Sequence, residues 1–234
     1  MDITLTIEFL SKEWIRNIAI TISIMLLYFL FASKTKDKDL TLFMKISSLL
    51  VFAMTLSNHI ILAIDESWTL RHDLPMHLCS VSALICCVIA FIKKNQFLFE
   101  FLFYAGIIGG LLSLSTPQII LYNEYYFFYI MFYFKHAAII AIPLVMRYRM
   151  KMNLSKKSWL KVFGAINLLF AIVIPINASV GSNYLYVSTP PQVNNPFIIE
   201  DLDKVFGLPT YVFYWEIIMI IFLLLLYFIF KKPK

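Results

Sequence analysis

The run IIMIIFLLLLYFIF, residues 217–230, contains no charged side chain and is followed directly by KKPK at 231–234. Together with the residues from about 209 onward it forms an apolar stretch of roughly 20 residues, the length of helix that crosses the hydrocarbon core of a bilayer. The whole chain has this character, with 61% hydrophobic residues, 17% aromatic residues and a mean hydropathy of +0.80. Such a composition excludes a soluble globular protein and predicts an integral membrane protein.

Seven stretches of this kind predict an all-α fold, a polytopic membrane helix bundle with seven transmembrane helices. They cover approximately 14–32, 41–64, 75–92, 97–114, 125–146, 158–177 and 209–230. No segment between them is long enough for a separate soluble domain, so we interpret residues 1–234 as a single integral membrane domain. The external segment 178–208 is dominated by turn residues, which predicts an irregular lid.

The charged residues predict the orientation of the helices. Basic residues follow the first, third, fifth and seventh spans, and acidic residues follow the second, fourth and sixth. The basic residues are Lys34, Lys36, Lys38, Lys93, Lys94, Arg147, Arg149, Lys151, Lys156, Lys157, Lys231, Lys232 and Lys234, and the acidic ones are Asp65, Glu66, Asp73, Glu124, Glu200, Asp201 and Asp203. Because cytoplasmic loops carry the excess of Lys and Arg, the N-terminus should lie outside and the C-terminus inside. These loops also account for the net charge of +6 without a nucleic-acid partner.

Seven polar residues lie in the outer half or near the midplane of four predicted helices. They are Asn58, His59, His77, Cys79, Lys135, His136 and Glu216. Exposing such groups to lipid would cost several kcal/mol in total, so we expect them to face the bundle interior or a hydrated cavity. Two interpretations remain open, a functional site and a structural polar cluster that ties the helices together.

Cys79 is the most reactive candidate among these residues. Cys86 and Cys87 lie in the same predicted helix, which argues against a disulfide framework, and both fit small buried packing residues. Cys79 differs because a histidine precedes it in LPMHLCS, residues 74–80. A thiol with a nearby base can carry acyl groups covalently.

Helix geometry predicts that the base for Cys79 comes from another helix. Residues two apart on a helix point in directions about 200° apart, so His77 should only flank the thiol. His136 and His59 remain as possible bases. We also expect Cys79 to lie a full turn inside its helix, where the effect of the helix N-terminus has mostly faded. No HxxxH, HExxH or CxxC spacing occurs, so neither a metal site nor another cofactor is expected.

Three motifs together resemble the YwaF-like family of bacterial integral membrane proteins, which is similar to the eukaryotic transmembrane protein 164 family. They are LPMHLCS at 74–80, Phe134-Lys135-His136, and GSNY at 181–184, and the resemblance runs in order through the second to seventh spans. It implies an acyltransferase that moves fatty acyl chains between phospholipids or lysolipids, with Cys79 as nucleophile and His136 as base. It also implies a bacterial plasma membrane protein.

The expected function is therefore acyl transfer or ester hydrolysis on outer-leaflet lipids. His77, Asn58 or Asn183 would stabilise the oxyanion. Tyr184, beside Asn183 in GSNY, is a further supporting residue.

A transporter or receptor-like binding protein is the main alternative. There the His, Lys and Glu cluster binds an anionic or amphipathic solute, and Lys135 and Glu216 matter more than Cys79. Lys135 either adds positive charge near the thiol or pairs with Glu216, and the sequence leaves both open. A third option is a scaffold, since Gly106 and Gly110 suit close helix packing within the protein or between subunits.

Overall fold

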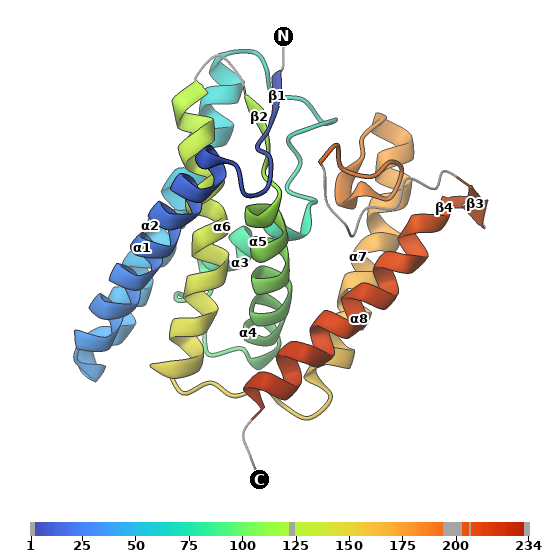
Figure 1. Cartoon of the computed structure of the whole chain (residues 1–234). Helices are drawn as coiled ribbons and strands as arrows, with labels where there is room; N and C mark the ends of the chain where they lie inside the picture. Colours follow the sequence, from blue (N-terminus) through green and yellow to red (C-terminus); the bar gives the residue numbers. More distant parts are fainter. Residues whose placement is uncertain (1–2, 122–124, 194–202, 206, 232–234) are drawn as a thin grey trace.

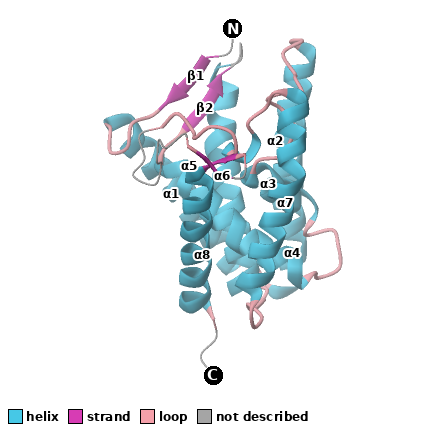
Figure 2. Ribbon diagram, turned by 90° about the vertical axis from the view of Figure 1, so that its right-hand side faces the viewer, coloured by secondary structure: helices cyan, strands magenta, loops and turns pink. Residues whose placement is uncertain are grey.

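Six helices are long and apolar enough to cross a membrane among the residues that the computed structural model describes, which are all but 1–2, 122–124, 194–202, 206 and 232–234 (Figures 1 and 2). Five of them are single helices: α1 (Lys12–Lys34), α2 (Asp37–Ile64), α6 (Tyr125–Tyr148), α7 (Ser158–Val180) and α8 (Thr210–Phe230). The sixth is a continuous rod made of α4 (Gln96–Phe101), the π-helical turn η1 (Leu102–Gly106) and α5 (Ile107–Ser115). Six of the seven predicted spans are thus confirmed as long apolar helices, with ends displaced by about four residues or fewer.

The remaining predicted span, 75–92, is only partly helical. Its helix, α3 (Leu78–Val88), has 11 residues. At 1.5 Å per residue it is about 16 Å long, roughly half the hydrocarbon thickness. The predicted start at residue 75 is wrong because the segment before α3 forms a loop, in which the Leu74 N–H bonds the Tyr184 hydroxyl at 2.8 Å and the Met76 N–H bonds the Leu74 carbonyl at 2.7 Å. The structure therefore supports six long spans and one short apolar helix inside the bundle.

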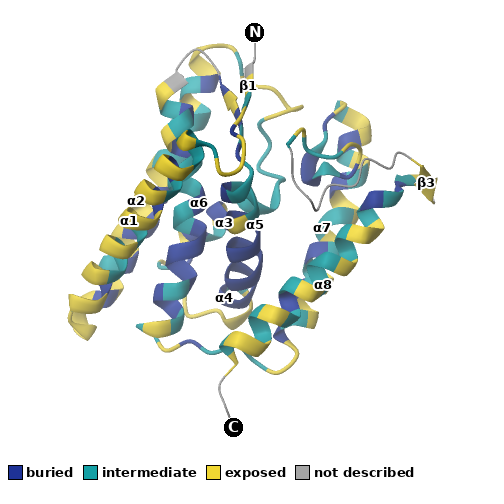
Figure 3. Ribbon diagram, in the orientation of Figure 1, coloured by how far each residue is buried: buried dark blue, intermediate teal, exposed yellow. Residues whose placement is uncertain are grey.

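The rod formed by α4, η1 and α5 is the centre of the bundle. Every residue from Phe101 to Gly110 is buried (Figure 3). Within the most apolar 18-residue stretch of each helix, 72% of the residues of this rod are buried, compared with 11% of those of α8. By contrast, α1, α2, α7 and α8 present many exposed Ile, Leu and Phe side chains. Lipid tails are as apolar as these side chains, so such faces are suited to contact with lipid.

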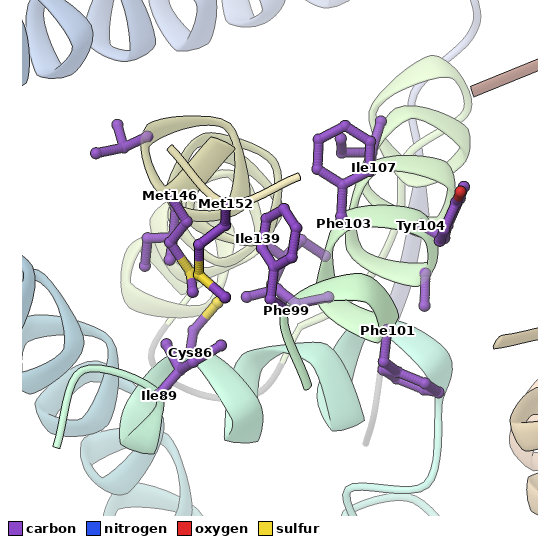
Figure 4. Packing of buried hydrophobic residues seen from close by; sticks show 14 of the residues in the cluster. Cys86, Ile89, Phe99, Phe101, Phe103, Tyr104, Ile107, Ile139, Met146 and Met152 are labelled. Atoms are coloured by element: carbon purple, nitrogen blue, oxygen red, sulfur yellow. The ribbon is translucent and has the colours of Figure 1, made fainter. Parts of the chain in front are cut away.

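The core around this rod contains two of the three cysteines. Cys86 is fully buried in a cluster with Ile139, Met146 and Met152, as Figure 4 shows. Cys87 is also buried, and all three cysteines are free thiols. Cys86 and Cys87 therefore pack as small apolar side chains.

Basic residues gather at the end of the bundle that carries the C-terminus (Figure 1). Arg149 Nε donates to the carbonyl of Ala32 at 2.9 Å, and Arg147 donates to the carbonyl of Phe230 at 3.0 Å. Cations at the carbonyl ends of α1 and α8 satisfy unpaired backbone acceptors. The basic segments that predict a cytoplasmic face thus share one end of the molecule. Glu124, Glu200, Asp201, Lys232 and Lys234, which also enter that prediction, lie outside the described residues.

Two small sheets at the opposite end were not predicted. Strands β1 (Ile3–Thr6) and β2 (Gln118–Leu121) pair in antiparallel fashion, as do β3 (Lys204–Val205) and β4 (Leu208–Pro209). The described part of the predicted lid, 178–208, contains the end of α7, a turn of 3-10 helix, η2 (Tyr184–Tyr186), and β3 and β4. The fold is therefore helical with short strands in its loops.

Candidate functional site

Seven of the nine predicted site residues line one cavity. Its volume is about 410 Å³, within the usual range for small-molecule sites. It lies among α2, α3, α5, α6, α7 and α8 and reaches the loops near the N-terminal end. The seven are Asn58, His59, His77, Cys79, Lys135, His136 and Glu216. These residues come from four helices, α2, α3, α6 and α8, and from His77, the N-cap of α3.

Asn183 and Tyr184 do not line this cavity. The Tyr184 hydroxyl accepts from the Leu74 N–H and donates to the Leu70 carbonyl, each at 2.8 Å. Asn183 donates from its amide to the Thr189 carbonyl at 2.8 Å. Both residues therefore shape loops, and the bonds of Tyr184 hold the segment before α3 against the segment after α7.

Cys79 is the second residue of α3, so the expectation that it lies a full turn inside the helix is wrong. The N-cap of α3 is His77, which makes no side-chain capping bond. A thiol in the first turn lies where the helix dipole favours negative charge. Burial nevertheless raises the pKa of Cys79 above its ordinary value, so formation of the thiolate requires a neighbouring base. The Sγ atom lies 3.4 Å from Ser113 Oγ on α5, a residue that the sequence analysis missed.

Glycines of the rod bring the helices of Cys79 and His136 together. A Cβ atom at Gly109 would lie 3.1 Å from Cys79 Sγ, and one at Gly110 would lie 2.6 Å from Ile140 Cγ1 and 3.1 Å from the His136 carbonyl oxygen. One short stretch of α5 therefore touches α3 through Gly109 and α6 through Gly110. The small residues of α5 thus allow close packing between helices of the same chain.

His136 carries the tautomer that a general base needs. The side chain is 4% exposed, and its Nδ1 lies 2.6 Å from the Phe132 carbonyl one turn earlier in α6. A carbonyl oxygen can only accept, so Nδ1 carries the proton and Nε2 of the neutral ring has a free lone pair. His136 is therefore able to take a proton through Nε2.

His59 and His77 have the opposite tautomer. Nδ1 of His59 accepts from the Trp68 indole N–H at 3.1 Å, and Nδ1 of His77 accepts from the Leu185 N–H at 3.3 Å. In each neutral ring the proton is then on Nε2, which makes that atom a donor. Burial, together with the charge of Lys135, lowers the pKa of His77 to about 4, so it is neutral at pH 7. Among these three histidines, only His136 presents an unprotonated Nε2.

Lys135 forms no ion pair with any residue in the described part of the chain. Glu216, its predicted alternative partner, accepts from Asn167 Nδ2 at 3.0 Å instead. The ammonium group of Lys135 acts electrostatically on Cys79, His77 and His136. The cavity therefore contains a cation that is free to bind an anionic group of a ligand.

Tyr186 is a second cavity residue that the sequence analysis missed. Its ring centroid lies 5.1 Å from that of His77. The only sequence signal was its position two residues after the GSNY motif.

Within the described residues, no group of three or more His, Cys, Asp or Glu side chains is arranged to hold a metal ion.

A family model described as the TMEM164 family matches residues 9–227, nearly the whole chain. No curated protein and no solved structure matches it. The match confirms the predicted resemblance to the transmembrane protein 164 family.

Proposed function

The chain belongs to the TMEM164 family, and from this membership and the cavity we propose a membrane-embedded enzyme that transfers acyl groups between lipids through Cys79 and His136. The observation that carries the proposal is the arrangement on α5, where Gly109 contacts the thiol and Gly110 contacts the helix of the base. The tautomer of His136 leaves Nε2 unprotonated, as a general base requires.

In the first half-reaction, His136 Nε2 removes the proton from Cys79, and the thiolate sulfur attacks the carbonyl carbon of a lipid ester. The tetrahedral intermediate collapses with cleavage of the ester C–O bond. The leaving lysolipid oxygen takes the proton from His136, and the acyl chain remains on Cys79 as a thioester. In the second half-reaction a lysolipid hydroxyl or water gives its proton to His136 and attacks the thioester, which frees the thiolate.

The remaining cavity groups suit a phospholipid. Apolar side chains that could accommodate an acyl chain line much of the cavity, namely Phe128, Met131, Phe132, Ile166, Phe170, Met219 and Phe222. The unpaired ammonium of Lys135 would bind the phosphate, as lysine does at many phosphate sites. We place the cavity toward the outer leaflet of a bacterial plasma membrane, with the basic end of the bundle in the cytoplasm.

The direct test is turnover of a phospholipid with a labelled acyl chain by purified protein. We expect Cys79→Ala to abolish transfer and hydroxylamine-sensitive labelling of the protein, and His136→Gln to lower the rate by about 10²–10⁴-fold. Cys87→Ala, which removes a buried thiol outside the cavity, is the matched control and should keep the rate. Turnover that survives in Cys79→Ala would rule out the proposed mechanism.

A binding or transport protein is the second candidate, and the unpaired Lys135 is the observation that favours it. In that case Lys135→Ala abolishes uptake or binding of an anionic amphiphile, whereas Cys79→Ala leaves it unchanged.

A further inference from the structure

Tyr186 is held in a backbone conformation that few side chains adopt. Leu185 and Tyr186 have φ angles of +58° and +54°, in the left-handed region where non-glycine residues are uncommon. Such backbone persists only where surrounding contacts impose it, and it is concentrated at functional sites. The backbone of Tyr186 therefore marks this residue as a candidate for a functional role.

Three hydrogen bonds from different parts of the chain impose this conformation. The Leu185 N–H donates to Nδ1 of His77 at 3.3 Å, and the Tyr186 N–H donates to the Asn183 carbonyl at 3.0 Å. The Tyr211 hydroxyl of α8 donates to the Tyr186 carbonyl. The loop after α7 is therefore fastened both to the N-cap of α3 and to α8.

These bonds place the Tyr186 ring at the cavity wall beside His77, close enough to Cys79 for the two groups to interact electrostatically. The hydroxyl makes no hydrogen bond to any residue that the structure describes, whereas the backbone N–H and carbonyl of Tyr186 are both hydrogen-bonded. Burial raises the pKa of Tyr186 to about 12, so the phenol keeps its proton at neutral pH. A neutral phenol is a hydrogen-bond donor, and this one has no acceptor within the described protein.

We propose that the Tyr186 hydroxyl donates a hydrogen bond to the oxyanion that forms on the lipid ester when Cys79 attacks it. This inference rests on the proposed function and assigns a residue to a step within it. The Nε2–H of His77 is the second donor, because Nδ1 of that ring is occupied by the Leu185 N–H. Asn183, an earlier candidate for this role, lies outside the cavity.

Tyr186→Phe separates this role from a structural one. The substitution keeps the aromatic ring against His77 and removes only a hydroxyl without a protein partner, so the melting temperature should stay the same. Loss of one oxyanion donor typically lowers kcat by about 10²–10³-fold. We therefore expect that loss in kcat for the labelled phospholipid, with KM unchanged within a few fold. Tyr214→Phe, at an exposed tyrosine on α8, is the control and should match the wild type.

Two further measurements identify the step at which Tyr186 acts. The rate of Cys79 alkylation by a maleimide should be unchanged in Tyr186→Phe, because the thiolate forms before the oxyanion. An acyl trifluoromethyl ketone, which forms a tetrahedral adduct with an active thiol, should bind at least 10²-fold more weakly to the variant.

The outcomes distinguish this inference from the proposed function. If Cys79→Ala is inactive but Tyr186→Phe keeps wild-type kcat and ketone affinity, the role of Tyr186 is overturned and the acyl-transfer proposal stands. A parallel fall in alkylation and kcat would also overturn it, since Tyr186 would then act on the thiol. If Cys79→Ala remains active, both proposals fall.

Discussion

Replacing Gly109 with alanine puts a methyl group against the thiol of Cys79. The new Cβ atom would lie 3.1 Å from Cys79 Sγ and 3.9 Å from both the Cys79 backbone nitrogen and Leu78 Cδ2. Non-bonded heavy atoms of this kind prefer separations of about 3.5–4.0 Å. The sulfur must therefore move by a few tenths of an ångström away from α5.

The free energy of unfolding should change little, whereas the rate should fall. Alanine is favoured over glycine in a helix interior by about 1 kcal/mol, which offsets a contact strain of about 1 kcal/mol or slightly more. A catalytic group displaced by 1 Å costs up to about 10²-fold in rate, so a smaller shift of Cys79 should lower acyl transfer about tenfold. The measurements are the melting temperature in detergent, the rate of Cys79 alkylation and the transfer rate.

Two other glycines serve as controls. At Gly164 a Cβ atom would meet nothing within 4 Å, so Gly164→Ala should gain the same helix propensity and keep full activity. At Gly106 it would lie 2.5 Å from the Ile139 carbonyl oxygen, so α6 must move and stability should fall by about 1–3 kcal/mol. A Gly109→Ala variant that folds normally and changes neither alkylation nor transfer would show that Gly109 does not position the thiol.

Two further predictions concern the charged groups of the cavity. Lys135→Gln should raise the KM for a phospholipid about tenfold, because a charge-assisted hydrogen bond is worth more than a neutral one. The KM for a diacylglycerol with the same acyl chains should stay unchanged. Equal losses on both lipids would contradict a role of Lys135 in phosphate binding. Because the folded-state pKa of His77, about 4, is below its ordinary value of 6.5, the stability that this neutral ring contributes is complete above pH 6.5 and is lost as the pH falls toward 4. The loss is at most about 3 kcal/mol, and the melting temperature of His77→Gln should depend less on pH over that range; an unchanged pH dependence would show that His77 is not responsible.

The long helices were predictable because the property that makes them is local. A stretch such as Ile217–Phe230 is apolar throughout, and in a bilayer only a helix satisfies its backbone groups internally. The start of α3 was not predictable in this way. Residues 75–77 are as compatible with an apolar helix as with a loop until Tyr184, more than a hundred residues later, bonds the backbone at Leu70 and Leu74.

The grouping of Cys79, Lys135 and His136 was also predictable, since polar side chains within apolar helices must turn away from lipid. Ser113 and Tyr186 were not predicted as site residues because a serine in a helix and a tyrosine in a loop are ordinary in a membrane protein. Tyr186 becomes distinctive only through its backbone angles and its position beside His77.

Hydrophobicity and helical spacing can be read locally, so the sequence alone predicts a helical membrane protein whose polar residues face the inside of the bundle. What each polar residue can do there depends on contacts that exist only in the folded protein. His59, His77 and His136 are equivalent in a sequence, but partners from other turns and loops set which ring nitrogen holds the proton. Likewise, only the packing of α7 beside α8 shows that Glu216 accepts from Asn167 and that Lys135 forms no ion pair among the described residues.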